Sequence, residues 1–297
     1  MDDGSAVSVV YRRLRASNLF QRIRSALILL PCTVLIVSVG EPLVSITVMT
    51  VAVLALFELY SMFQAGGFVP RRRTGYFSVV LFVLAAVVGT RTGLELSGSA
   101  LAIAIMVSLG YEVLFQERDA QLLNWSLTLT GAAYIGWTLA HFVLLRHIQH
   151  PLRGLGAVLP FGAGAVWIFL VFAITMASDT AAYFVGKRFG RTRMAPYVSP
   201  NKSWEGAIGG GVAAMIASAV AVVLLGLPVG IWGGMLLGVI GSAAGQIGDL
   251  AESLIKRQLG AKDSGNLIPG HGGLLDRIDS LLFTAPIVYY LAIILTR

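Results

Sequence analysis

The sequence predicts an all-α fold: a polytopic integral membrane bundle of about nine transmembrane helices, with its N-terminus in the cytoplasm. Two observations predict this class. Of the 297 residues, 56% are hydrophobic and 12% are charged, with a mean hydropathy of +0.79, which is more apolar surface than one soluble core can bury. Apolar segments of about 20 residues, long enough to cross a membrane, recur along almost the whole chain, and helices satisfy their own backbone hydrogen bonds in lipid.

Nine segments are apolar enough to be counted as spans. They cover residues 26–40, 42–63, 74–90, 97–115, 125–145, 162–185, 206–226, 229–249 and 280–296. Only Glu41-Pro42 separates the first two, and the first is short, so a re-entrant pair is the alternative there. The arginines before Leu27 resemble the start of a signal peptide, but no small-residue cleavage site follows, and we expect a retained anchor.

The distribution of basic residues tests this count, because cytoplasmic loops hold most of the Lys and Arg. Nine spans with the N-terminus inside place 18 of the 22 basic residues in the cytoplasm. The other four are Arg91, Arg146, Arg153 and Arg297. The strong imbalance supports the predicted orientation.

The net charge of +7 therefore belongs mainly to one face. Such a face suits membrane lipids and other phosphates as partners, whereas nucleic acid is not expected. The single cysteine, Cys32, excludes an intramolecular disulfide and a multi-thiolate metal site.

The polar motifs are concentrated in the second half of the chain. We expect residues 1–120 to be scaffold helices and residues 121–297 to be the catalytic membrane domain, with cytoplasmic loops at 186–205 and 250–279. The glycine-rich stretches GAIGGG, from Gly206, and GGMLLG, from Gly233, indicate closely packed helices.

Two acids lie inside apolar spans of the scaffold, Glu58 and Glu112. A charge at the centre of a span costs about 2.5–3.5 kcal/mol on insertion scales. We expect both side chains to lie near the cytoplasmic ends of their helices and to reach the interface, since Arg71–Arg73 and Arg118 lie nearby in the sequence.

Two pairs of acids flank the last long loop. If the helix before the loop continues, Asp249, Glu252, Ser253 and Lys256 share one side of it. Asp276 and Asp279, three residues apart, open the final span. Hard oxygen ligands in a shallow polar site suit Mg²⁺ with a nucleotide phosphate, because this ion keeps several waters and takes one or two protein carboxylates.

The loop between the acid pairs is rich in cations and glycines, which suits a bound phosphate. The predicted phosphate-binding cations are Lys256, Arg257, Lys262 and Arg277, the glycines are Gly265, Gly270, Gly272 and Gly273, and His271 is a further candidate binder.

The other long loop holds SPNKSWEG, from Ser199 to Gly206, after SDTAAYFVGKRFGR. Lys202, Ser203 and Glu205 stand where an apolar helix begins. Asp179, in or at the end of a span, is the most costly acid in the chain to leave unpaired, and an ion pair with a neighbouring helix is the alternative to a substrate contact.

The run SLIKRQLGAKDSGNLIPGHGGLLDRID, Ser253 to Asp279, resembles the signature of the phosphatidate cytidylyltransferase (CDP-diacylglycerol synthase) family at every fixed position. SPNKSWEG and the SD-x-x-A-Y pattern from Ser178 are also similar to this family. The resemblance covers about residues 178–297 strongly, and the first half only through its hydropathy.

The resemblance implies transfer of CMP from CTP to phosphatidic acid at the cytoplasmic face of the cell (inner) membrane, by a homodimer that uses Mg²⁺, with a second cation left open. It implies Asp249 and Asp276 as metal ligands. The other residues implied in catalysis are Lys256, Arg257, Lys262, Asp263, His271, Arg277 and Asp279. The residues implied in substrate binding are Asp179, Ser199, Asn201, Lys202, Ser203, Glu205, Glu252, Ser253, Gly272 and Gly273.

Two other functions would share some of these sequence features. A CDP-alcohol phosphotransferase, or another lipid nucleotidyl- or phosphotransferase, also needs acids, Mg²⁺ and a nucleotide, but the D-G-x2-A-R run expected of the former is missing from the sequence. A transporter of anionic solutes places charges near the midplane in paired, broken helices, whereas here the charges gather at one face.

Overall fold

The structure is a computed structural model that describes residues 31–115, 120–268 and 272–296. Within these residues, eight helical spans are long and apolar enough to cross a membrane. They are α2 (Leu43–Ala65), α3 (Arg72–Thr92), α4 (Ser97–Leu114), the continuous run α5–η1–α6 (Gln121–Arg146), α8 (Ala163–Phe189), α9 (Trp204–Leu225), α10 (Gly230–Gln258) and α11 (Leu275–Leu295). The predicted helical membrane fold is confirmed.

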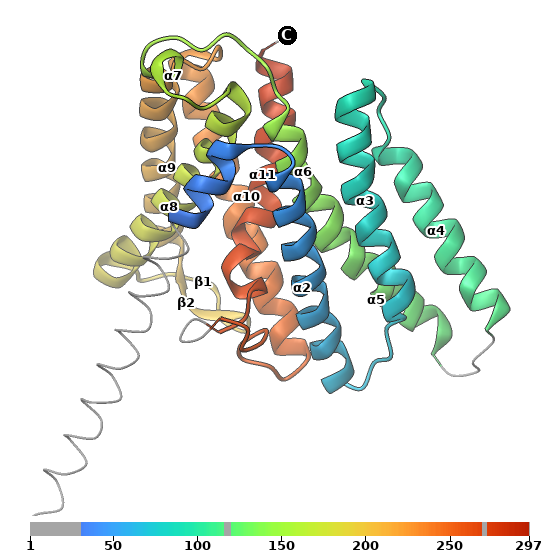
Figure 1. Cartoon of the computed structure of the whole chain (residues 1–297). Coiled ribbons are helices and arrows are strands. Elements are labelled where there is room, and N and C mark those ends of the chain that lie inside the picture. Colours follow the sequence, from blue (N-terminus) through green and yellow to red (C-terminus); the bar gives the residue numbers. More distant parts are fainter. Residues whose placement is uncertain (1–30, 116–119, 269–271, 297) are drawn as a thin grey trace, which may run out of the picture.

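The first predicted span, 26–40, lies partly outside the described residues. From residue 31 to 39 the chain is helical, and Figure 1 shows this short helix, in blue, beside the start of α2. The second predicted span, 42–63, corresponds to α2. The eight spans found in the described residues thus correspond to the second to ninth predicted spans, and the first predicted span is not tested over its full length.

The predicted span 125–145 is a single helical run with an irregular centre. It consists of α5 (Gln121–Ala132), a π-helical turn η1 (Ala133–Trp137) and α6 (Thr138–Arg146). Outside the spans, a short helix α7 (Leu155–Val158) lies in the connection to α8.

Small residues bring α8, α9 and α10 into close contact. A Cβ atom placed on Gly210 of α9 would lie 2.8 Å from the Ser178 carbonyl oxygen of α8. One placed on Gly234 of α10 would lie 3.0 Å from Ala219 Cα of α9. Only glycine allows the backbones to approach this closely, so the predicted packing role of the glycine-rich stretches is confirmed.

The prediction of purely helical structure missed one hairpin. Strands β1 (Arg193–Ala195) and β2 (Ser199–Ser203) pair antiparallel between α8 and α9, beyond the end of α8 in Figure 1. The sequence SPNKS of β2 lacks the apolar alternation that predicts a strand, which is why the hairpin was expected to be a loop.

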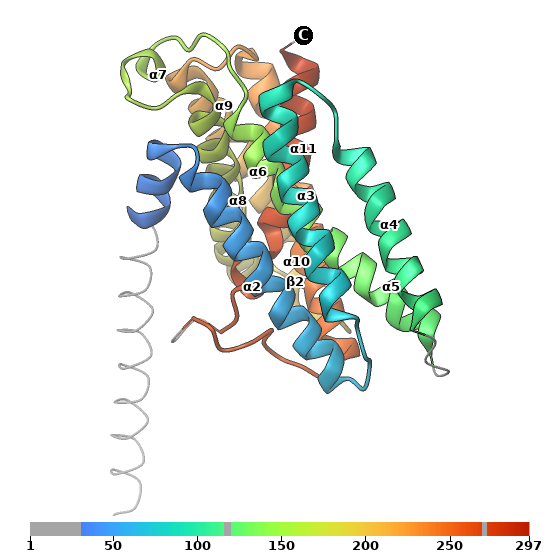
Figure 2. The ribbon, with the colours of Figure 1, turned by 45° about the vertical axis from the view of Figure 1, so that its right-hand side comes forward.

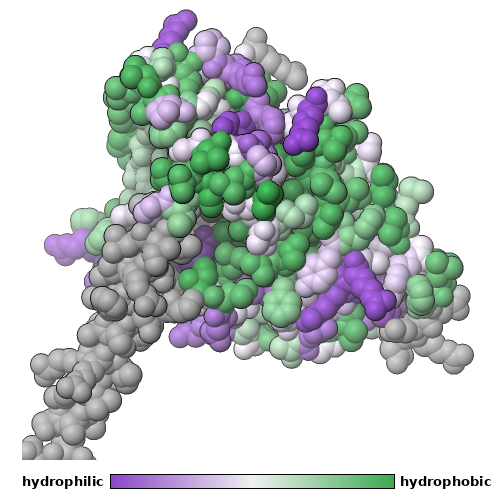
Figure 3. All heavy atoms as spheres, in the orientation of Figure 1, coloured by the Kyte–Doolittle hydropathy of each residue, from purple (hydrophilic) through white to green (hydrophobic). Residues whose placement is uncertain are grey.

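Successive spans run in opposite directions, so the connections fall on two faces. The connections α2–α3, α8–α9 and α10–α11 lie at the lower end in Figures 1 and 2, and we call this end the loop face. The connections α3–α4, α6–α8 and α9–α10 lie at the opposite end. In Figure 3 an apolar band separates hydrophilic residues at the two ends.

The loop face carries the basic clusters, as the sequence predicted. Arg71–Arg73, Lys187, Arg188, Lys202 and Lys256 lie at or near it, whereas Arg91, Arg146 and Arg153 lie at the opposite end. Which side of a membrane the loop face occupies stays a prediction from the positive-inside rule.

The two halves of the chain share one core. Helices α2 and α6 pack against α11, and Leu56 and Leu59 of α2 are as fully buried as Leu275 and Leu282 of α11. Residues before position 120 are therefore in direct contact with the helix that begins at the second pair of acids.

Candidate functional site

The polar stripe predicted at the end of α10 is present. Because α10 stays helical through Gln258, Asp249, Glu252, Ser253 and Lys256 lie on one side of it. Ser253 Oγ donates a hydrogen bond to Asp249 Oδ1 at 3.4 Å. Helix α10 thus carries two acids and a cation to the loop face.

Lys256 lies between two carboxylates. Its Nζ is 2.8 Å from Glu252 Oε2 of the same helix and 2.5 Å from Asp276 Oδ1 of α11. The exposed fraction is 12% for the Lys256 side chain, 1% for Glu252 and 8% for Asp276. In this structure the ammonium group joins α10 to α11. Its ion-pair partners are protein carboxylates, although the sequence predicted a substrate phosphate.

Asp276 receives four donors. Its Oδ1 accepts from Lys256, and its Oδ2 accepts from Ser264 N at 2.9 Å, Ser264 Oγ at 3.0 Å and Gly273 N at 3.0 Å. The Gly273 N–H, which was predicted to meet a substrate phosphate, is therefore taken by Asp276. This carboxylate anchors the loop between α10 and α11.

The two ends of this loop also meet through the backbone. Ile268 N donates to Gly272 O at 3.0 Å, and Gly272 has a positive φ of +83°, which favours glycine. His271, predicted as a binder, lies outside the described residues.

A second cluster, which we call the Asp249 cluster, joins four elements. Lys202 Nζ of β2 lies 2.6 Å from Asp249 Oδ2 of α10, and both side chains are partly exposed. Asp279 of α11 interacts electrostatically with Asp249 and with Asp179 of α8. Three carboxyl groups and one ammonium group therefore lie close together at this place.

Two of the residues predicted to bind substrate near the hairpin, Ser203 and Glu205, form hydrogen bonds within the protein. Ser203 Oγ accepts from Gly206 N at 3.2 Å and caps α9. Glu205 accepts from the backbone N–H groups of Arg191 and Thr192, each at 3.1 Å, so it ties the hairpin to α9. These two predicted substrate residues have clear structural partners.

Four other predicted residues are available to a ligand. Asn201, Lys262, Asp263 and Arg277 are exposed and, within the described chain, form no ion pair. Ser199 is partly exposed in β2. Arg257 is exposed as well, and its Nε donates to the Val198 carbonyl at 3.3 Å, which places the end of α10 beside the hairpin.

The prediction for Glu58 and Glu112 was wrong in one respect. Neither side chain reaches the interface: Glu58 is 3% exposed and Glu112 is 7% exposed. Glu112 forms an ion pair with Arg71 at 2.9 Å, which agrees with the proximity expected from the sequence. Glu58 instead accepts from Leu274 N, Leu275 N and Ser264 Oγ.

Sequence reasoning missed Glu58 and Ser264 as parts of this site. They are separated by 206 positions in the chain, so no local spacing connects them. The available signal was the acid inside an apolar span, since intramembrane ionisable residues commonly mark functional sites.

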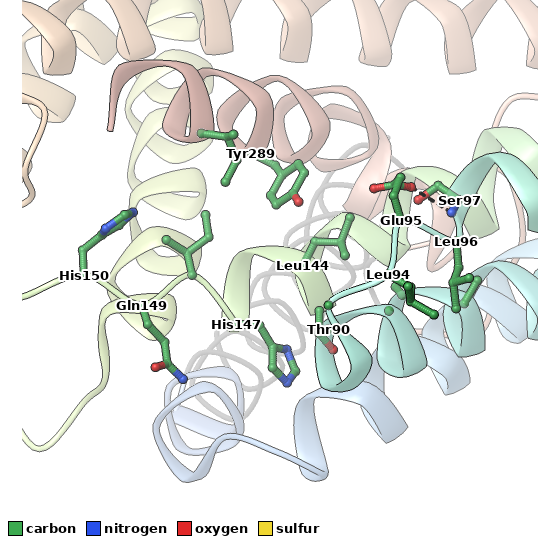
Figure 4. A pocket seen from close by; sticks show the side chains of 16 residues that line it. Thr90, Leu94, Glu95, Leu96, Ser97, Leu144, His147, Gln149, His150 and Tyr289 are labelled. Carbon is green, nitrogen blue, oxygen red and sulfur yellow. Dashed lines mark hydrogen bonds between the residues drawn. The ribbon is translucent and has the colours of Figure 1, made fainter. Parts of the chain in front are cut away.

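A pocket of about 410 Å³ lies at the end opposite the loop face, between α3, α6 and α11. Figure 4 shows His147, His150, Glu95 and Tyr289 around it. None of the predicted site residues lines this pocket.

A sequence profile described as the cytidylyltransferase family matches residues 20–295. The chain belongs to the cytidylyltransferase family. Among its relatives are the phosphatidate cytidylyltransferases of Brucella suis (36% identical, covering 92% of this chain and 93% of the relative), Synechocystis (33%, covering 93% and 97%) and Bacillus subtilis (32%, covering 91% and 96%). The match to this cytidylyltransferase family extends through the scaffold half, for which the sequence offered only hydropathy.

The acids of the site fit Mg²⁺ to different degrees. Within the described residues, no three Asp, Glu, His or Cys side chains form a group that could hold a metal ion by themselves. Asp249 nevertheless suits one ligand position, because Mg²⁺ takes one or two carboxylates and fills the rest with water and phosphate oxygens. Asp276 suits it less in this arrangement, because its oxygens already receive four donors.

Proposed function

We propose that the protein transfers CMP from CTP to phosphatidic acid and releases CDP-diacylglycerol and pyrophosphate. Membership of the cytidylyltransferase family and the names of its relatives support the reaction class. One observation supports its place: Lys202 of β2, Asp249 of α10 and Asp279 of α11 converge at the loop face.

The proposed step needs no strong base. An oxygen of the lipid phosphate attacks the α-phosphorus of CTP, a new O–P bond forms, and the bond to the oxygen bridging the α- and β-phosphorus breaks. Pyrophosphate leaves with that oxygen and the electron pair. Because the second pKa of a phosphomonoester is about 6, the lipid oxygen is largely ionised at neutral pH. Catalysis then depends on alignment and on neutralising charge.

The proposed phosphate contacts come from basic side chains that are exposed or partly exposed at the loop face. Lys262 and Arg277 are exposed, and Arg257 is held beside the hairpin by Val198 O. Lys202 is paired with Asp249 and is partly exposed, so it can turn from its acid to a phosphate oxygen. These groups would orient the triphosphate and hold it against the electrostatic repulsion of the lipid phosphate.

Asp249 is the proposed protein ligand of Mg²⁺, and Asp279 and Asp179 lie close enough to interact with it electrostatically. Bound there with nucleotide phosphate, the ion would neutralise negative charge on the phosphate oxygens. Asp276 as a second ligand stays a prediction, since binding a metal would require its Oδ1 to exchange Lys256.

We further propose that the loop face lies in the cytoplasm and that the protein resides in the inner membrane, because its basic residues gather at that face. A homodimer is an expectation from the family resemblance. Within this proposal, the anionic headgroup of phosphatidic acid would approach from the cytoplasmic leaflet, where the exposed cations of the loop face lie.

The test uses purified protein with phosphatidic acid, Mg²⁺ and labelled CTP, scored for a lipid-soluble cytidine product. We expect product from the wild type, and at least about a hundredfold loss in kcat for Asp249→Asn, because an electrostatic contact to the reacting groups is worth about 10²–10³ in rate. Glu112→Gln, a buried acid outside the site, is the matched control. Absence of product from folded wild type would reject the function, whereas full activity of Asp249→Asn would reject the site.

A further inference from the structure

We infer that Glu58 of α2 is a positioning residue for this reaction. It holds the loop between α10 and α11, which carries Lys262 and Asp263, against the start of α11. The kinetic consequence of this inference rests on the proposed function; the structural part does not.

Three donors converge on the Glu58 carboxylate. Leu274 N donates to Oε1 at 3.0 Å and Leu275 N donates to Oε2 at 2.8 Å. The Ser264 hydroxyl, whose one hydrogen is shared with Asp276, lies 3.2 Å from Oε2. Within the described residues no cation pairs with Glu58. A buried carboxylate is costly unless it accepts hydrogen bonds, so Glu58 needs these donors. The donors in turn are held in place by the carboxylate.

Helix α11 needs an acceptor that its own sequence does not supply. The residue at its N-cap is Leu274, whose side chain makes no capping hydrogen bond, although the first N–H groups of a helix require partners. Glu58 supplies the acceptor from another helix, and its negative charge is favourable at a helix N-terminus. Glu58 of α2 therefore accepts hydrogen bonds from N–H groups at the start of α11.

Glycines on both sides of the loop make room for Glu58. A Cβ atom on Gly265 would lie 2.5 Å from Glu58 Oε1, and one on Gly273 would lie within 3.0 Å of Glu58 Oε2. The sequence suggested that these glycines bring the backbone close to a substrate phosphate. In the structure, the anion that they approach is this carboxylate.

Ser264 connects Glu58 to the predicted catalytic acid. Its Oγ lies 3.2 Å from Glu58 Oε2 and 3.0 Å from Asp276 Oδ2, while its N–H donates to Asp276 Oδ2. One hydroxyl carries one hydrogen, so the two carboxylates share it. A change at Glu58 is thereby transmitted to Asp276 and to its partner Lys256.

The test compares Glu58→Gln with Glu112→Gln in lipid nanodiscs. Both changes remove a buried charge near the loop face, but Glu112 pairs with Arg71 and does not touch the loop. We expect Glu58→Gln to speed amide hydrogen exchange in residues 272–280 at least about tenfold, the factor that one hydrogen bond to a charged group is worth. Its kcat per folded molecule should fall by a similar factor.

Ser264→Ala gives a second, smaller perturbation of the same connection, and it carries the test if Glu58→Gln does not fold. We expect it to speed the same exchange and to lower the same kcat. Because Glu58 and Ser264 share one of their contacts, the double variant should lose less than the product of the two single losses.

Unchanged exchange in residues 272–280, or a kcat per folded molecule equal to that of Glu112→Gln, would overturn the inference. A double variant whose loss equals the full product of the two single losses would show that the Ser264–Glu58 contact does not couple the two residues, and would also overturn the inference. A wild type without cytidylyltransferase activity would reject the proposed function instead, and the exchange measurement would still decide whether Glu58 holds the loop.

Discussion

The ion cluster around Lys256 leads to a prediction about stability. Replacing Lys256 by Met keeps most of the side-chain length and removes the charge. The change leaves Glu252, 1% exposed, and Asp276, 8% exposed, without the ammonium that lies 2.8 and 2.5 Å from them. Removing one partner of a buried ion pair costs about 3–5 kcal/mol. At about 2–4 °C per kcal/mol, the factor for domains of 150–250 residues, that corresponds to a fall in Tm of about 6–20 °C.

The assay is thermal unfolding in detergent, with Lys262→Met as the matched control. Lys262 is exposed and, among the described residues, unpaired, so its loss should cost no more than about 0.5 kcal/mol. Adding Glu252→Gln to Lys256→Met removes one of the two buried carboxylates that have lost their cation. This double variant should therefore regain part of the lost stability. Equal Tm values for Lys256→Met and Lys262→Met would refute the reasoning.

Three further predictions follow from single contacts. Ser203→Ala removes the cap on Gly206 N and should cost about 1 kcal/mol of stability, seen as a small fall in Tm; an unchanged Tm would contradict this. Gly210→Ile should reduce the yield of folded protein, because a Cβ there meets the Ser178 carbonyl oxygen at 2.8 Å, whereas Gly211→Ile, where nothing lies within 4 Å, should not; equal yields would count against the packing. Lys262→Ala should raise the KM for CTP about tenfold, the worth of one hydrogen bond to a charged group, with normal Tm; an unaltered KM would remove Lys262 from the nucleotide site.

Much of the fold was predictable because the signals were local. Apolar length located the eight spans of the described chain, and the spacing of Asp249, Glu252 and Lys256 placed them on one side of α10. The clustering of Lys and Arg predicted which connections share a face. Each of these patterns depends on residues close together in the sequence.

What escaped prediction depends on partners far apart in the chain. The sequence did not show that Asp249 pairs with Lys202 of the hairpin, or that Asp276 accepts from Lys256, Ser264 and Gly273. That the two acids hold one metal ion stays a prediction. Which cation meets which acid is decided by how the helices pack. Hydropathy does not contain that information.

Glu58 illustrates the same limit. Its position inside α2 marks it as costly, yet its partners come from a loop more than 200 positions away. From the sequence, an acid that reaches the interface and an acid that caps another helix look alike. The structure separates them by showing the burial and the donors.

The most direct test of the central claim is to locate the bound nucleotide. The protein in nanodiscs would be irradiated with a photoreactive CTP analogue, and the labelled peptides identified by mass spectrometry. The account predicts label in residues 199–205 or 257–268 at the loop face, suppressed by excess CTP. Suppressible label confined to the opposite end, at residues 90–97 or 147–150 around the pocket of Figure 4, would contradict it.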